Sequence, residues 1–173
     1  MLKTVRYIVK WADAPEAKNV VFIDMFEEKN IHKYIYGLVQ DKTNMIYYIS
    51  CQSHIGKLTI TCTTINKADL GRGKITNISQ IIDPNERRVA LTFDQQPETV
   101  YVYRVTPMSI SFYGSVSYTG VLENEVTSVS INNGLLMITF ALGKRVDVYR
   151  LDEVQTDDGG LSFAKPIFRL TSQ

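Results

Sequence analysis

Several residue types and patterns are scarce in this chain of 173 residues, and each scarcity excludes a class of protein. Two cysteines are too few for a disulfide-dense scaffold. No run approaches the roughly 18 consecutive apolar residues of a transmembrane helix, and Lys10 interrupts the short apolar stretch near the N-terminus, which does not match a secretory signal peptide. The 19 basic and 18 acidic residues leave a net charge of +1, so we expect no nucleic-acid partner.

Residue groups that support catalysis or bind metals are also missing. Cys51 and His54 lie three positions apart on a predicted hairpin, where they point to different faces and have no carboxylate to orient the histidine. Two cysteines and one nearby histidine are too few for a metal site. Asp157–Gly160 lacks the alternating oxygen ligands of a calcium loop. We therefore expect no catalytic site, no cofactor and no metal.

The residues that are abundant favour β-structure. Val, Ile and Thr together exceed a quarter of the chain, with 10 Tyr and 7 Phe, and these side chains suit a pleated surface better than a helix. Apolar and polar residues alternate with a period of two, and no window has a sustained helical period. The pattern predicts an all-β chain with half-buried strands, and it is clearest in Lys57–Cys62, Thr99–Val105, Met108–Phe112 and Val126–Ile131.

Two short turns are predicted between apolar runs. Asn133–Gly134 supplies the positive φ angles of a tight hairpin, and Gly56–Lys57 fits a two-residue turn with glycine first. If Gly56–Lys57 is a hairpin turn, Cys51 and Cys62 lie directly opposite each other, and a cross-strand disulfide is possible. The alternative is a pair of reduced thiols, which the low cysteine content favours. Reduced thiols in turn favour a cytoplasmic location for the protein.

Two segments of the chain resemble each other. In both, a Thr-Phe pair ends one strand-like run and a Tyr-Arg-aliphatic triplet ends the next, and equivalent positions such as Arg104 and Arg150 are 46 residues apart. A further strand-like segment follows each copy, at residues 108–118 and 161–170. The matched runs are Ile75–Ser79, Arg88–Phe93 and Val100–Val105 in the first copy, and Val126–Ser130, Leu135–Phe140 and Val146–Leu151 in the second.

A weaker third copy lies upstream. Its second to fourth strands are Val20–Met25, Tyr34–Leu38 and Met45–Ile49, and Thr4–Val9 supplies its first strand. The stretch 57–65 does not fit the period and is predicted to be an extra strand. The chain is thus predicted to be one all-β domain, residues 1–173, with repeat-like units at about residues 4–50, 75–118 and 126–170.

Four strands in each 40–50 residues, repeated, are typical of a β-propeller blade. From Ile75 to Leu170 the sequence resembles divergent WD40-like blades that lack the Gly-His and Trp-Asp dipeptides, with Tyr103-Arg104 and Tyr149-Arg150 standing where Trp-Asp would end the third strand. The resemblance implies a partial or small β-propeller. The alternative is a β-sandwich or β-barrel, whose strands are also regularly spaced.

The number of repeats indicates a function. Propellers close with about 4–8 blades, whereas this chain supplies three to four, and an unclosed set of blades exposes strand edges and an apolar sheet face. We therefore expect a non-catalytic scaffold or protein-interaction module, a subunit or fragment of a larger assembly. Its partner is expected to be another protein or a second copy, and no membrane-spanning segment is expected.

Tyrosines are the candidate contact residues, because they combine apolar area with a polar tip. The interaction candidates are Tyr34, Tyr36, Tyr47, Tyr48 and Tyr113. In the alternative function they are stacking platforms of a carbohydrate- or small-ligand-binding β-sandwich, and in the structural interpretation they fill space between packed sheets. Matched arginines, Arg104 and Arg150, are candidates to bridge adjacent blades.

Overall fold

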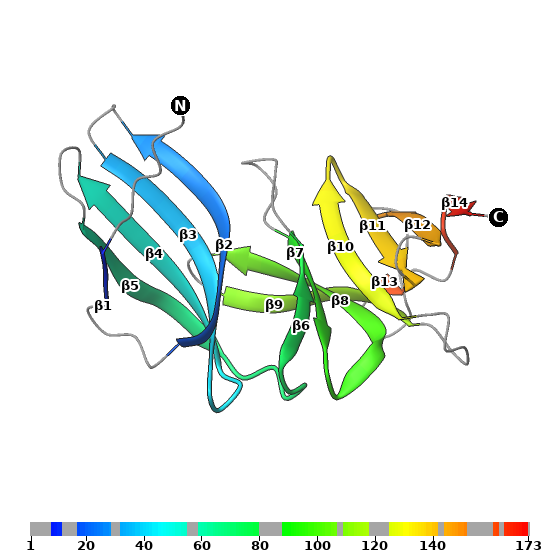
Figure 1. The fold of residues 1–173 in the computed structure, drawn as a ribbon, viewed down its shortest axis with the longest axis horizontal. Helices are drawn as coiled ribbons and strands as arrows, with labels where there is room; N and C mark the ends of the chain where they lie inside the picture. Colours follow the sequence, from blue (N-terminus) through cyan, green and yellow to red (C-terminus); the bar gives the residue numbers. More distant parts are fainter. Residues whose placement is uncertain are drawn as a thin grey trace. The chain divides into compact units, whose positions relative to one another are not determined.

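The structure is a computed structural model, shown in Figure 1. It describes residues 8–11, 17–28, 32–54, 59–79, 88–106, 109–117, 125–141, 144–151, 161–162 and 165–172. Every regular element of these ranges that is longer than one residue is a β-strand, which confirms the all-β prediction. The chain forms two compact units, Met1–Asp69 and Leu70–Gln173, which are described separately.

The first unit is one five-stranded sheet, called sheet 1. Its strands are Ile8–Trp11 (β1), Ala17–Glu28 (β2), His32–Asp41 (β3), Ile46–His54 (β4) and Thr59–Ala68 (β5). Strands β2 to β5 pair in sequence order and antiparallel, and β1 pairs parallel with β5 at the far edge from β2.

This order differs from the predicted upstream repeat in two ways. The stretch 57–65 is not an extra strand, because its described part lies in β5, the fourth antiparallel strand of the sheet. The predicted first strand, Thr4–Val9, is described only from Ile8, and there it lies beside β5 and not beside β2. The period-two pattern of a strand predicts which residues share a face, but it does not predict which neighbour the strand pairs with.

The turn between β3 and β4 is built around the carboxylate of Asp41. Oδ1 accepts hydrogen bonds from the backbone N–H of Thr43 (2.8 Å) and Met45 (3.0 Å) and from the Thr43 hydroxyl (2.7 Å). Oδ2 accepts one from the Tyr47 hydroxyl at 3.0 Å. Burial raises the pKa of Asp41, but the hydrogen bonds outweigh it and leave the pKa below its ordinary value. Burial and the bonded Asp41 carboxylate raise the pKa of Tyr47.

We expect this turn to make the free energy of unfolding of sheet 1 decrease at acid pH. Because the folded pKa of Asp41 is lowered, its contribution is present above the unfolded pKa of about 3.9 and is lost as the pH falls through the folded value. Urea denaturation at a series of pH values measures the loss. Asp41→Asn should remove part of the pH dependence below about pH 4, and an unchanged profile in that variant would contradict the assignment.

The second unit contains two sheets. Sheet 2 comprises Ile75–Ile78 (β6), Arg88–Phe93 (β7), Gln96–Thr106 (β8), Ser109–Ser117 (β9) and Leu161–Ser162 (β13). Sheet 3 comprises Val126–Asn132 (β10), Leu135–Phe140 (β11), Arg145–Arg150 (β12) and Phe168–Thr171 (β14). In each sheet four strands pair antiparallel in sequence order, which is the predicted four-stranded repeat.

Two details of sheet 3 bear on the predicted repeat. The β10–β11 hairpin turns at Asn133 and Gly134, whose φ angles of 48° and 73° confirm the predicted positive-φ turn. Of the segment 161–170, only the later part forms the fourth strand of sheet 3. Residues Leu161–Ser162 instead form β13, which pairs parallel with β9 of sheet 2.

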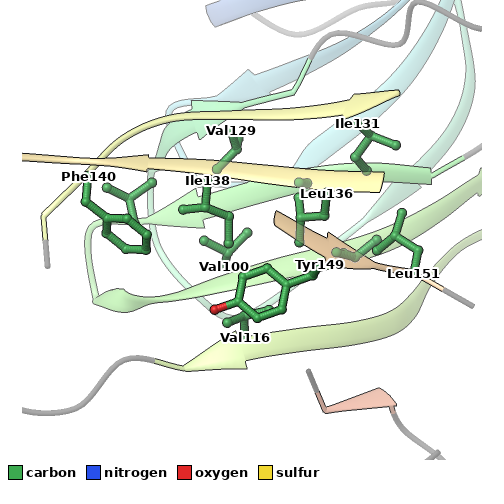
Figure 2. Close-up of a cluster of buried hydrophobic side chains, with 12 residues drawn as sticks. Val100, Val116, Val129, Ile131, Leu136, Ile138, Phe140, Tyr149 and Leu151 are labelled. Carbon is green, nitrogen blue, oxygen red and sulfur yellow. The ribbon is translucent and has the colours of Figure 1, made fainter. Parts of the chain in front are cut away.

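The core of the second unit lies between sheets 2 and 3. Figure 2 shows valines of β8 and β9 facing aliphatic and aromatic side chains of sheet 3. The first strand of sheet 3 also lies against the first strand of sheet 2, where the Asn77 side-chain amide donates to the Val126 carbonyl at 3.2 Å. The core residues are Ala90, Val100, Val102, Val116, Val126, Val129, Ile131, Leu136, Ile138, Phe140, Tyr149 and Leu151.

Sheet 2 is buried more completely than its sequence predicts. In β8 the valines and tyrosines alternate, as predicted, but both sets are buried: Val100 and Val102 on one side, Tyr101 and Tyr103 on the other. The alternation by itself predicts a half-buried strand with one face in water. The tyrosine face is covered because the Arg72 guanidinium lies over the Tyr101 ring and Phe112 packs edge-on against both tyrosines, while their hydroxyls keep hydrogen-bond partners.

Candidate protein-interaction surface

Sheet 3 has one buried face and one open face. Residues that pair across an antiparallel ladder lie on the same face, and Met137 pairs with Val148, which pairs with Phe168. The neighbouring pair, Val146 and Leu170, lies on this face too. Of their sequence neighbours, Leu136, Ile138 and Tyr149 belong to the core with sheet 2. We call the side chains of Met137, Val146, Val148, Phe168 and Leu170 the open face.

The open face is equivalent, residue by residue, to the face that sheet 2 packs against sheet 3. The repeat aligns Val100 and Val102 of β8 with Val146 and Val148 of β12. Strand pairing gives the same correspondence. Residues that are aligned by the repeat also pair with aligned residues on the neighbouring strands, so that matching rows of paired residues run across both sheets. These rows are Ala90–Val102–Gly114 and Val100–Val116 in sheet 2, and Met137–Val148–Phe168 and Val146–Leu170 in sheet 3.

Exposure is where the two equivalent faces differ. Ala90, Val100 and Val102 have no exposed surface, because sheet 3 covers them. On the open face Met137 is 42% exposed and Leu170 56%. Scattered exposed apolar residues are ordinary, whereas a contiguous exposed apolar face marks an interaction site. By the internal repeat, the open face of sheet 3 is thus equivalent to a face of sheet 2 that a second sheet covers.

On the opposite face, an ion pair between the buried Asp147 of β12 and the half-exposed Arg169 of β14 holds β14, and with it part of the open face, against β12. Asp147 has no exposed surface, and Arg169 donates to both of its oxygens, Nε to Oδ1 at 2.7 Å and Nη2 to Oδ2 at 2.8 Å. Arg145 Nη2 lies 3.4 Å from Oδ2, and the guanidinium of Arg145 stacks 4.1 Å from the Phe140 ring centre. Two parallel hydrogen bonds between a guanidinium and a carboxylate hold the two side chains in one relative orientation and also add binding energy.

A tyrosine of β9 ties sheet 2 to the end of β12, while the bridging role of the matched arginines stays a prediction. From β9 of sheet 2, the Tyr113 hydroxyl donates to the carbonyl of Leu151, at the end of β12, at 2.9 Å. Arg88 donates to the same hydroxyl at 3.2 Å, and the guanidinium of Arg104 lies 5.4 Å from the ring centre. Arg150 is exposed. Because its ring and hydroxyl already have partners within the unit, Tyr113 serves to join sheets 2 and 3.

A cluster around Arg72 was missed by sequence reasoning. Its guanidinium lies 3.9 Å from the Tyr101 ring centre, and its Nε donates to the Tyr103 hydroxyl at 2.9 Å. Both flanking glycines have positive φ, and a Cβ at Gly73 would collide with Asp94 and Gln95. Two glycines around one arginine were the available signal, since they indicate a backbone that only glycine adopts easily. Burial raises the pKa of Tyr103 despite the opposing effect of Arg72.

The other tyrosine candidates lie in sheet 1. Tyr48 is 7% exposed and is therefore a core residue, while Tyr47 is half-buried and donates to Asp41. The strand positions of Tyr34 and Tyr36 are described in β3, opposite Gln52 and Ser50, but their side chains lie outside the described part of the structure. Every tyrosine whose side chain the structure describes is buried or half-buried.

The cysteines lie where the predicted hairpin places them. Cys51 of β4 and Cys62 of β5 are opposite each other in register, both are fully buried, and the structure joins them in a disulfide. The low cysteine content had favoured separate thiols, but direct opposition in one ladder brings the two sulfurs together. The turn itself, residues 55–58, and the side chain of His54 lie outside the described residues, as does Asp157–Gly160.

Within the described part of the chain, no group of three or more His, Cys, Asp or Glu side chains is placed to hold a metal ion. In the same part, no helix has the length and apolarity needed to cross a membrane.

Comparison with solved structures identifies the fold. The WD40 domain of SCAP from fission yeast is similar, with a TM-score of 0.58 at 16% sequence identity over 92% of this chain. The fold is β-propeller-like. The chain covers only 36% of that WD40 domain's chain. Myxococcus xanthus glutaminyl cyclase aligns with 97% of this chain and 60% of its own, at 10% identity and a TM-score of 0.41. No family model matches the chain, and no curated protein matches it.

Proposed function

We propose that this chain is a non-catalytic protein-interaction module, a subunit of a larger propeller-like assembly, and that the open face of sheet 3 is its docking surface. The observation that supports the proposal is the equivalence between the open face and the face by which sheet 2 packs on sheet 3. By repeat position, the residues of this face are buried in sheet 2, whereas in sheet 3 Met137, Phe168 and Leu170 are exposed and the two valines of β12 are half-buried.

The occupant that fits this face is a β-sheet of a partner protein. Sheet 3 covers the equivalent face of sheet 2 with an aliphatic surface that includes Val129, Ile131, Leu136 and Ile138. The partner sheet should therefore be antiparallel, four-stranded and aliphatic on the contacting face, because apolar side chains of this size interdigitate across about 10 Å between stacked sheets. The similar WD40 domain supports the same conclusion, since most of its chain lies outside the match.

Site-specific crosslinking tests this docking directly. A photo-crosslinking amino acid replaces Val148, at the centre of the open face, in the chain expressed in its native cells. We expect crosslinks to residues of one partner protein that form a β-sheet, identified by mass spectrometry of the joined peptides. Adding Met137→Arg should abolish them, because a charge at the centre of an apolar contact is desolvated without a partner.

A matched control separates docking from general effects of added charge. Ser117→Arg places the same charge on an exposed position of β9, opposite the uncharged Thr99, and should leave the crosslinks intact. Thermal melting should be unchanged in both arginine variants, since both positions are exposed in the isolated chain. Crosslinks only between copies of this chain, crosslinks that survive Met137→Arg, or no crosslink at all would each overturn the proposed partner.

A further inference from the structure

The outer edges of sheets 1 and 2 share an unusual feature. In each, the fourth antiparallel strand has a short parallel strand on its outer side: β1 beside β5, and β13 beside β9. In sheet 2 the pairing is Leu161 with Gly114 and Ser162 with Ser115. A parallel fifth strand beside the last antiparallel strand therefore occurs twice in this chain. In sheet 1 it precedes the other strands in the sequence, and in sheet 2 it follows them.

Sheet 3 ends without such a strand among the described residues. Its fourth strand, β14, is the last in the pairing order, and every residue of it is exposed. Gly114 and Ser115 of β9 pair with residues of β8 whose repeat equivalents in β12 pair with Phe168 and Arg169 of β14. Gly114 and Ser115 are therefore equivalent to Phe168 and Arg169. An exposed edge with apolar side chains is the part of a sheet that most readily accepts another strand.

We propose that the outer edge of β14 binds an extended peptide segment of a partner protein, aligned parallel to β14 and held by main-chain hydrogen bonds. This is strand addition at a sheet edge, in which the backbone supplies affinity and alternate side chains supply specificity. It is a second docking mode, independent of the packing of a whole sheet on the open face.

The side chains of β14 indicate the chemistry of the peptide. Phe168 and Leu170 lie on the open face, and Arg169 lies on the other face, where it donates to both oxygens of Asp147. Residues opposite each other in a parallel pair share a face. The peptide should therefore carry apolar residues opposite Phe168 and Leu170 and a small polar residue between them. By the register of sheet 2, Leu161 and Ser162 occupy the equivalent positions.

The hydrogen bonding of β14 identifies a position that can block the edge. The backbone N–H of Ser172 donates to the carbonyl of Lys144 in the turn before β12, at 2.8 Å. Because bonded groups alternate along an antiparallel ladder, the N–H of the preceding residue, Thr171, points away from β12. Proline is tolerated on an edge strand where its missing N–H faces solvent, so Thr171→Pro removes an outward donor while the bond from Ser172 is kept.

Fluorescence anisotropy on the full chain tests the proposal. The probe is a labelled synthetic peptide with the sequence of residues 159–165, which contains the apolar, small polar, apolar pattern. We expect saturable binding that Thr171→Pro weakens about tenfold or more, while Thr171→Val, which keeps the N–H, binds as the wild type. Methylating the peptide's backbone nitrogens one at a time should block binding at alternate residues only. The melting temperatures of the two variants establish that both are folded.

Three outcomes would overturn the proposal. The first is no saturable binding up to a concentration on the order of 1 mM. The second is binding that Thr171→Pro leaves unchanged, which would place the peptide at the β9 edge in exchange with β13. The third is binding that Met137→Arg abolishes and Thr171→Pro does not, which would place the peptide on the open face. None of these outcomes alters the crosslinks from Val148, so the two proposals fail separately.

Discussion

Phe140→Ala is expected to destabilise the second unit by about 3–5 kcal/mol. Phe140 ends β11 with no exposed surface, in the core between sheets 2 and 3. Truncation removes a buried ring and leaves a cavity beside Ile138, and it also removes the surface on which Arg145 stacks at 4.1 Å. Urea denaturation followed by far-ultraviolet circular dichroism measures the loss.

The matched control for Phe140→Ala lies on the same strand. Met137→Ala shortens a side chain of β11 that points to the open face and is 42% exposed. It should change the free energy of unfolding by no more than about 0.5 kcal/mol. Similar losses in both variants would contradict the division of sheet 3 into a buried face and an open face.

Asp147→Ala is expected to cost about 2–3 kcal/mol and to detach β14. The variant removes two charge-assisted hydrogen bonds from Arg169 and leaves Arg145 beside an apolar core without its 3.4 Å partner. Amide hydrogen exchange should show faster exchange along Phe168–Thr171 than in the wild type. Circular dichroism of the remaining strands should change little until denaturant is added.

Two further variants test whether the pair acts as a unit. Asp147→Asn keeps the shape and one acceptor but loses the charge, so its cost should be smaller than that of Asp147→Ala. The double variant with Arg169→Ala should cost about as much as Asp147→Ala alone, because residues in one network are not additive. An Asp147→Ala protein that melts and exchanges like the wild type would show that the ion pair does not hold β14.

The repeat in the second unit was predictable because local sequence determines most of it. The Thr-Phe and Tyr-Arg matches fix the strands β7, β8, β11 and β12, and Asn133–Gly134 fixes one turn. The parallel strands β1 and β13 were not predictable. Each is short and pairs with a strand about 50 residues away in sequence, as Ile8 does with Thr59 and Leu161 with Gly114, and periodicity within a segment contains no information about so distant a partner.

An exposed apolar face was predictable, but the residues that form it were not. The count of repeats predicted an apolar face, whereas tyrosines were chosen as its contact residues. Tyr48 is instead a core residue, and Tyr113 bonds within the second unit. The exposed side chains of the open face are Met137, Phe168 and Leu170. Strand alternation in Val146–Arg150 indicates two faces but does not show which is covered, because burial depends on whether another sheet follows.

The position of β13 has a consequence for the order of folding. Sheet 2 has its four antiparallel strands once residue 117 has been synthesised, yet its outer edge stays open until residues 161–162 follow, after the first three strands of sheet 3. Earlier segments fold first on the ribosome. More than 40 further residues must therefore be synthesised after β9 before β13 can complete sheet 2. A ribosome that stalls between β12 and β13 would display an unprotected strand edge, where nascent chains on neighbouring ribosomes could pair.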